Sequence, residues 1–125
     1  MTDPVITKQG ALAPCKDMLR KDLYVVFTRP ADSLARVLEN VGPHLEFQID
    51  LERRGIMFGA GPLWSDDEKH WHGEGMVIIR AANMTEARKI AESDPMHASG
   101  ARVFTIRPWT LNEGTVTIKV NYSDG

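Results

Sequence analysis

The sequence has a single cysteine, Cys15, and no long apolar run. One cysteine excludes an intrachain disulfide framework and a cysteine-rich zinc site, so we expect a reducing, cytoplasmic setting. Every apolar run, such as residues 76–79, is far shorter than the roughly 20 residues that a membrane-spanning helix needs. The N-terminal stretch lacks the basic start and apolar block of a signal peptide, so export is not expected.

A dominant charge of one sign is also lacking. The 15 Lys and Arg residues stand against 17 Asp and Glu, which gives a net charge of -2. No overall field would therefore attract nucleic acid or an anionic membrane, and neither partner is expected. What is present, 42% hydrophobic and 26% charged residues in a chain of 125, is typical of one soluble globular domain.

Local patterns predict strands that alternate with two helical regions. Helical spacing begins after Asp32 or Ser33, is interrupted at Gly42-Pro43 and resumes over 44–54, with Gly55 as its stop. A second helix is predicted between Asn83, paired with Glu86 as a capping box, and Asp94-Pro95. The predicted strands are 23–28, 56–63, 75–81, 103–107 and 115–120.

The order of these elements predicts an α+β, ferredoxin-like β-α-β-β-α-β fold with an extra C-terminal strand. Residues 22–125 would form this domain, and residues 1–21 would be an extension outside it. Two helices on one face of an antiparallel sheet leave the other face uncovered. Because monomers rarely expose so much apolar surface, we expect a homodimer in which a second sheet packs there, or a higher oligomer built from such dimers.

His44 and Asp94 are the leading candidates for chemistry. His44 follows Pro43 at the start of a helical segment, and Asp94 ends a helix before Pro95. A carboxylate that fixes the tautomer of a histidine leaves the other ring nitrogen free to act as a general base. The alternative is that His44 is a partly exposed first-turn residue and that Asp94 only closes its helix.

Other candidates concern a pocket or a metal. His70 and His72 lie at strand spacing among acidic residues, but a polar hairpin loop explains them as well as a metal site does. No metal is therefore predicted, and no nucleotide, flavin or haem motif occurs. Residues that we expect to line a small-molecule pocket are Phe47, Trp64, Met96 and Trp109.

Short motifs in order along the chain resemble the YciI-like (YCII-related) family of dimeric α+β barrel proteins. The resemblance covers roughly residues 22 to 110 and departs from the family pattern in the N-terminal extension and in the Met96-His97 pair. The motifs that carry it are Tyr24-Val25-Val26, Pro43-His44-Leu45, Gly55 leading into Gly61-Pro62-Leu63, Glu86-Ala87-Arg88, Asp94-Pro95, Gly100 and Arg107-Pro108-Trp109.

The resemblance implies a ferredoxin-like protomer, a dimer that closes a barrel, and a pocket faced by His44 and Asp94. It is compatible with a cofactor-free isomerase or lyase that moves a proton on a small unsaturated or carbonyl-bearing molecule. Two alternatives from other classes remain at this point. One is a non-catalytic module that binds a metabolite or a protein in the same pocket, and the other is a purely structural interaction domain without a pocket.

Overall fold

The computed structural model describes residues 2–124, which divide into two units. One unit is Asp22–Trp109, and the other consists of the terminal segments Met1–Lys21 and Thr110–Gly125. No helix of the described residues is long and apolar enough to cross a membrane. Asp22–Trp109 contains the candidate site.

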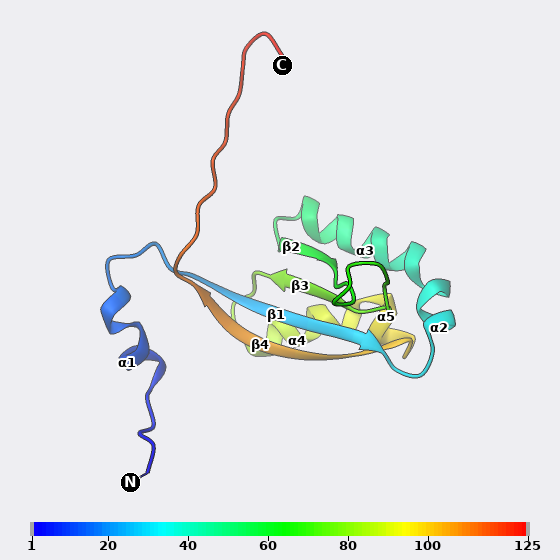
Figure 1. Cartoon of the computed structure of the whole chain (residues 1–125), viewed down its shortest axis with the longest axis horizontal. Helices are drawn as coiled ribbons and strands as arrows, with labels where there is room; N and C mark the ends of the chain where they lie inside the picture. Colours follow the sequence, from blue (N-terminus) through cyan, green and yellow to red (C-terminus); the bar gives the residue numbers. More distant parts are fainter. Residues whose placement is uncertain (1, 125) are drawn as a thin grey trace. The chain divides into compact units, whose positions relative to one another are not determined.

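A four-stranded sheet in the order β2-β3-β1-β4 forms the centre of this unit (Figure 1). β3 pairs antiparallel with both β1 and β2. The α+β, ferredoxin-like prediction is thus confirmed, because the predicted strand runs rich in Val, Ile, Phe and Tyr become neighbours in an antiparallel sheet. The strand bounds are β1 (Lys21–Pro30), β2 (Met57–Pro62), β3 (Gly75–Ile79) and β4 (Arg102–Leu111).

The strand register decides which side chains share a face of the sheet. Val26 and Ala60 both oppose Val77, and Thr28 opposes Gly75. Thr28 bonds to a histidine of a packed helix, so its face is the one covered by helices. Phe27, next to it in the strand, points to the opposite face and is exposed.

The first helical region is divided at Asn40 into α2 (Leu34–Glu39) and α3 (Val41–Arg53). The predicted interruption at Gly42-Pro43 is therefore placed two residues too late. Pro43 is the third residue of α3, where its missing N–H would have had no partner inside the helix. The bond from the His44 N–H to the Asn40 carbonyl, 3.0 Å long, begins the regular pattern.

The second helical region consists of α4 (Met84–Ser93) and the short α5 (Pro95–Ala98). Asn83 caps α4, since its side-chain oxygen accepts from the N–H of Glu86 at 2.9 Å. Asp94 caps α5 in the same way. Pro95 disfavours helical geometry at Asp94, which adopts φ -61° and ψ 128°, and this separates α4 from α5.

A tight core holds the ends of these helices together. Val37 of α2, Met96 of α5 and Ala101 are almost completely buried against one another. Val41 and Trp71 pack against this cluster from α3 and from the loop after β2. α3 and α5 are therefore packed together at the place where the candidate side chains lie.

The terminal unit contains α1 (Lys8–Leu12), a 3-10 helix η1 (Ala13–Cys15) and the C-terminal segment. The predicted strand at 115–120 is wrong, because these residues form no regular secondary structure. Val116, Ile118 and Val120 alternate with polar residues as predicted, yet all three are exposed. Alternation alone does not make a strand, since the backbone also needs a neighbouring strand for its hydrogen bonds.

Candidate functional site

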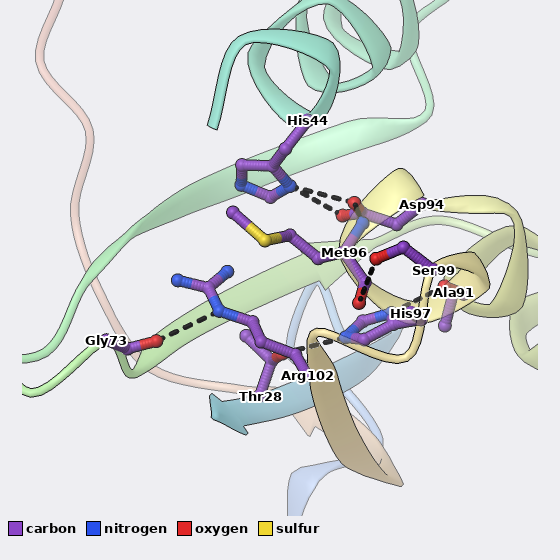
Figure 2. A network of polar contacts seen from close by, with 9 residues as sticks. All are labelled: Thr28, His44, Gly73, Ala91, Asp94, Met96, His97, Ser99 and Arg102. Atoms are coloured by element: carbon purple, nitrogen blue, oxygen red, sulfur yellow. Dashed lines mark hydrogen bonds and ion pairs between the residues drawn. The ribbon is translucent and has the colours of Figure 1, made fainter. Parts of the chain in front are cut away.

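His44 and Asp94, which are 50 residues apart in sequence, are in direct contact. Nδ1 of His44 lies 2.9 Å from Oδ1 and 2.8 Å from Oδ2 of Asp94 (Figure 2). A carboxylate only accepts, so Nδ1 carries the proton and donates it. The two side chains are 13% and 7% exposed, so water has little access to this contact.

The backbone around each residue explains this contact. Pro43 places His44 in the first turn of α3, and Pro95 keeps Asp94 extended at the start of α5. The same Asp94 carboxylate also accepts from the N–H of Met96 at 2.9 Å. Asp94 therefore caps α5 and orients His44 at once, and the two readings of this residue from sequence were not exclusive.

A cavity of about 410 Å³ opens next to His44. It lies between one face of α3, the strands β2 and β3, and the loop that joins them. Its walls are mostly apolar, with a few polar side chains, as is usual for sites that bind small molecules. The lining residues are Thr28, Val41, His44, Leu45, Gln48, Ala60, Gly61, Pro62, Trp64, Trp71, Glu74, Gly75, Met76, Val77, Met96 and Arg102.

Of the four residues expected to line a pocket, Trp64 and Met96 do so. Phe47 and Trp109 are not among the lining residues. Phe47 lies off the α3 face that His44 and its i+4 neighbour Gln48 present to the cavity. Trp109 is seven residues beyond Arg102 in β4, which is about 23 Å along an extended strand.

Arg102 is a pocket residue that the sequence analysis did not single out. It is the first residue of β4 and only 6% exposed. Its Nε donates to the carbonyl of Gly73 at 2.9 Å, and its Cζ lies 5.8 Å from the centre of the Trp71 ring. Burial lowers the pKa of Arg102, and the nearby Asp94 carboxylate opposes this. Extending the alternation of Phe104 and Ile106 one step backwards would have placed Arg102 on the inner face.

His97 forms a second polar network beside the cavity. Its Nδ1 contacts the carbonyl of Ala91 at 2.6 Å, which requires a proton on Nδ1. Nε2 lies 2.7 Å from the hydroxyl of Thr28, a residue that lines the pocket. Burial lowers the pKa of His97, so the ring is held neutral and accepts from Thr28. This residue was noted from sequence only as an unusual neighbour of Met96.

The loop histidines are arranged differently. The rings of His70 and His72 stack with their centres 6.4 Å apart, and Nδ1 of His70 is 3.6 Å from a carboxylate oxygen of Asp67. Across residues 2–124, no group of three or more His, Cys, Asp or Glu residues is placed to hold a metal ion.

These features define a class: a small α+β domain with an antiparallel sheet and a histidine–carboxylate pair at the edge of a mostly apolar pocket. Comparison with known proteins identifies the family of this domain. Residues 23–110 match the family described as the YCII-related domain. The chain belongs to this family, and the resemblance seen in its sequence motifs is confirmed.

Two individual relatives are also similar to this chain. The protein YjpA of Bacillus subtilis (strain 168) is 35% identical over 77 residues, which cover 60% of this chain and 81% of YjpA. Among solved structures, 5-chloro-2-hydroxyhydroquinone dehydrochlorinase (TftG) from Burkholderia phenoliruptrix AC1100, in complex with 2,5-dihydroxybenzoquinone, has a TM-score of 0.58. That comparison covers 70% of this chain and 92% of TftG at 20% identity, which shows that the fold is shared.

Proposed function

We propose that this protein is a small enzyme that needs no cofactor and transfers a proton on an unsaturated or carbonyl-bearing metabolite through His44 and Asp94. One observation carries the proposal. Nδ1 of His44 is hydrogen-bonded to a buried carboxylate, while Nε2 has no hydrogen bond within residues 2–124. His44 also lines the cavity. Figure 2 shows Nε2 on the side of the ring turned away from Asp94.

The arrangement suits general acid–base catalysis. Nε2 of His44 would take a proton from a carbon next to the substrate's carbonyl group, and the electrons of the C–H bond would move into the conjugated system. The positive imidazolium would be stabilised by the carboxylate of Asp94 at 2.8 Å. Return of the proton to another carbon completes an isomerisation, and loss of a leaving group with its electron pair completes an elimination.

The shared fold with TftG supports a reaction of the elimination type, because TftG is described as a dehydrochlorinase. The apolar walls of the pocket support a small organic substrate over a charged polymer. The protein contains no other histidine–carboxylate contact as close as His44–Asp94 in its described part.

The test is hydrogen exchange in D₂O, because a base that removes a carbon-bound proton also exchanges it for deuterium. A panel of small enones, unsaturated acids, lactones and chlorinated hydroquinones is incubated with the full chain and followed by proton NMR. We expect His44→Gln to lower the exchange rate of any responding compound by about 10²–10⁴-fold. His70→Gln, a histidine outside the pocket, is the matched control and should exchange like the unmodified protein.

Two results would contradict the proposal. Exchange that persists in the His44→Gln variant would remove His44 as the base. If panel compounds bind in the pocket but none exchanges or reacts, the protein is instead a binding module that uses the same cavity.

A further inference from the structure

Arg102 is a mostly buried residue whose terminal nitrogens have no partner among the residues that the structure describes. Its Nε is used by the Gly73 carbonyl, but within residues 2–124 neither Nη1 nor Nη2 has a hydrogen bond or an ion pair. The residue is 6% exposed and lines the cavity. A guanidinium has five N–H donors, and Nη1 and Nη2 are not among the fully buried unpaired atoms of the described residues, so they reach the open space of the cavity.

The carboxylates near Arg102 do not fill this role. Asp94 is already bonded to His44 and to the N–H of Met96. Glu74 lines the same cavity, but it is an exposed residue and forms no ion pair with Arg102. An anionic ligand in the space in front of the guanidinium would therefore supply acceptors for Nη1 and Nη2.

We propose that Arg102 anchors the carboxylate of a small planar unsaturated acid, which is the substrate class of the site. The planar fork of a guanidinium matches a carboxylate through two parallel hydrogen bonds. Trp71, whose ring lies 5.8 Å from Cζ of Arg102, and Trp64 provide flat apolar walls for the rest of the molecule. A cavity of about 410 Å³ is of the size that holds a small organic acid.

This inference rests on the proposed function and specifies how the substrate would be oriented in the pocket. In Figure 2 the Met96 side chain lies between the Arg102 guanidinium and the His44 ring. An acid held by Arg102 at one end would direct its conjugated carbons toward Nε2 of His44. The transferred proton would then come from a carbon conjugated with the carboxylate and not from the carboxyl group itself.

The test uses two probes of nearly identical shape, benzoate and the neutral benzamide, titrated into the full chain by calorimetry. We expect benzoate to bind at least about tenfold more tightly than benzamide, since charge-assisted bonds are worth more than neutral ones. Arg102→Gln should abolish this preference. Arg102→Lys, which keeps the charge but not the planar fork, should retain only part of it.

Controls separate this proposal from effects on folding or on catalysis. Arg54→Gln removes an exposed guanidinium that does not line the cavity and should keep the preference for benzoate. Thermal melts check that the Arg102 variants fold, and the comparison of the two probes on the unmodified protein needs no variant at all. His44→Gln should still prefer benzoate although it no longer exchanges protons.

The outcomes decide each proposal separately. Equal binding of the two probes to the unmodified protein, no binding of benzoate, or an undiminished preference in Arg102→Gln would overturn the anchor. Deuterium exchange that Arg102→Gln leaves unchanged would overturn it as well, while proton transfer by His44 would stand. An Arg102-dependent preference in a protein that exchanges no compound would leave the anchor in place and refute the proposed catalysis.

Discussion

Oδ1 of Asp94 accepts a hydrogen bond from Nδ1 of His44 and another from the N–H of Met96 at the start of α5. One side chain thus fixes a helix and a ring together. Both hydrogen bonds are shielded from solvent, so water competes little for the groups that form them. Because the two bonds make different demands on the side chain, substitutions can separate them.

Asp94→Asn is expected to keep the helix cap and lose the ring orientation. The amide oxygen can still accept from the Met96 N–H, since Asn caps helices as well as Asp does. The amide NH₂ would take the place of Oδ2, 2.8 Å from Nδ1 of His44, and would donate there instead of accepting, which favours the tautomer with its proton on Nε2; that tautomer could not act as a base. We expect a loss of about 1 kcal/mol or less in the free energy of unfolding, with exchange activity lowered by about 10²-fold or more.

Asp94→Ala is the companion variant, because it removes the cap as well. It should cost about 1–3 kcal/mol in urea unfolding, from the lost cap and the unpaired buried ring. If Asp94→Asn exchanged protons as fast as the unmodified protein, Asp94 would be a helix cap only.

The stability of the protein should fall in mildly acidic solution because of His97. Burial is the main cause that lowers the pKa of His97 from its ordinary 6.5; Arg102 and His44 add to this, while the Ala91 carbonyl and Asp94 oppose it. The unfolded chain therefore binds more protons than the folded one between 6.5 and the lowered value. This contribution to stability is complete above pH 6.5 and is lost as the pH falls through that window.

His97→Gln removes this titration and should flatten the dependence of the free energy of unfolding on pH below 6.5. Urea unfolding at a series of pH values from 7.5 downwards measures it. His70→Gln, whose ring is 67% exposed, should leave the slope as it is. An equal slope in the His97→Gln and unmodified proteins would show that other groups cause the acid sensitivity.

Much of the fold follows from local signals in the sequence. Gly55 does stop α3, with φ +73°, and Asn83 does cap α4, because these effects depend only on the backbone within a few residues. The break before Pro43 was misplaced by two residues because a proline is tolerated anywhere in the first turn of a helix. The strand at 115–120 failed because its formation depends on a partner strand that a local pattern does not reveal.

The site was predictable only in part. His44 and Asp94 were found because each lies beside a proline in a motif of the family. Alternation along β4 indicates that Arg102 faces inward, but its contacts with Gly73 and Trp71, about thirty residues away in sequence, cannot be inferred from a local pattern. Phe47 shows the opposite error: an aromatic residue near His44 was assigned to the pocket, although the turn of the helix directs it elsewhere.

Gly73 should tolerate no side chain, and its replacement should disturb Arg102. It has φ +86°, and a Cβ built on it would lie 2.6 Å from Cγ of Pro30. Gly73→Ala is expected to cost about 1–3 kcal/mol in urea unfolding from backbone strain, with a further cost from the contact. Because the Gly73 carbonyl holds Nε of Arg102, the preference for benzoate over benzamide should fall too.

Gly59→Ala is the matched control for this change. Gly59 has no atom within 4 Å of a built Cβ and no positive φ, so its replacement should alter stability much less. If the two alanine variants unfolded at the same urea concentration, the conformation and crowding at Gly73 would not limit stability.

We also propose that two copies of the chain pack through the sheet face that lacks helices. Phe27 and Val103 lie on this face, since their strand neighbours Thr28 and Phe104 contact His97 on the other. Phe27 is 42% and Val103 41% exposed, and apolar residues of neighbouring strands on one face favour packing against a second sheet. Light scattering should therefore give a mass twice that of the 14.0 kDa chain.

Val103→Lys should convert this dimer to a monomer, because a buried lysine without a counter-charge is costly in a sheet interface. Val116→Lys changes an exposed valine in the terminal unit and should leave the mass unchanged. The pocket lies on the helix-covered face, so the Val103→Lys monomer should still bind benzoate if the site needs only one chain. A mass of 14.0 kDa for the unmodified protein at micromolar concentration would refute the dimer, and loss of benzoate binding in a folded monomer would show that the partner completes the site.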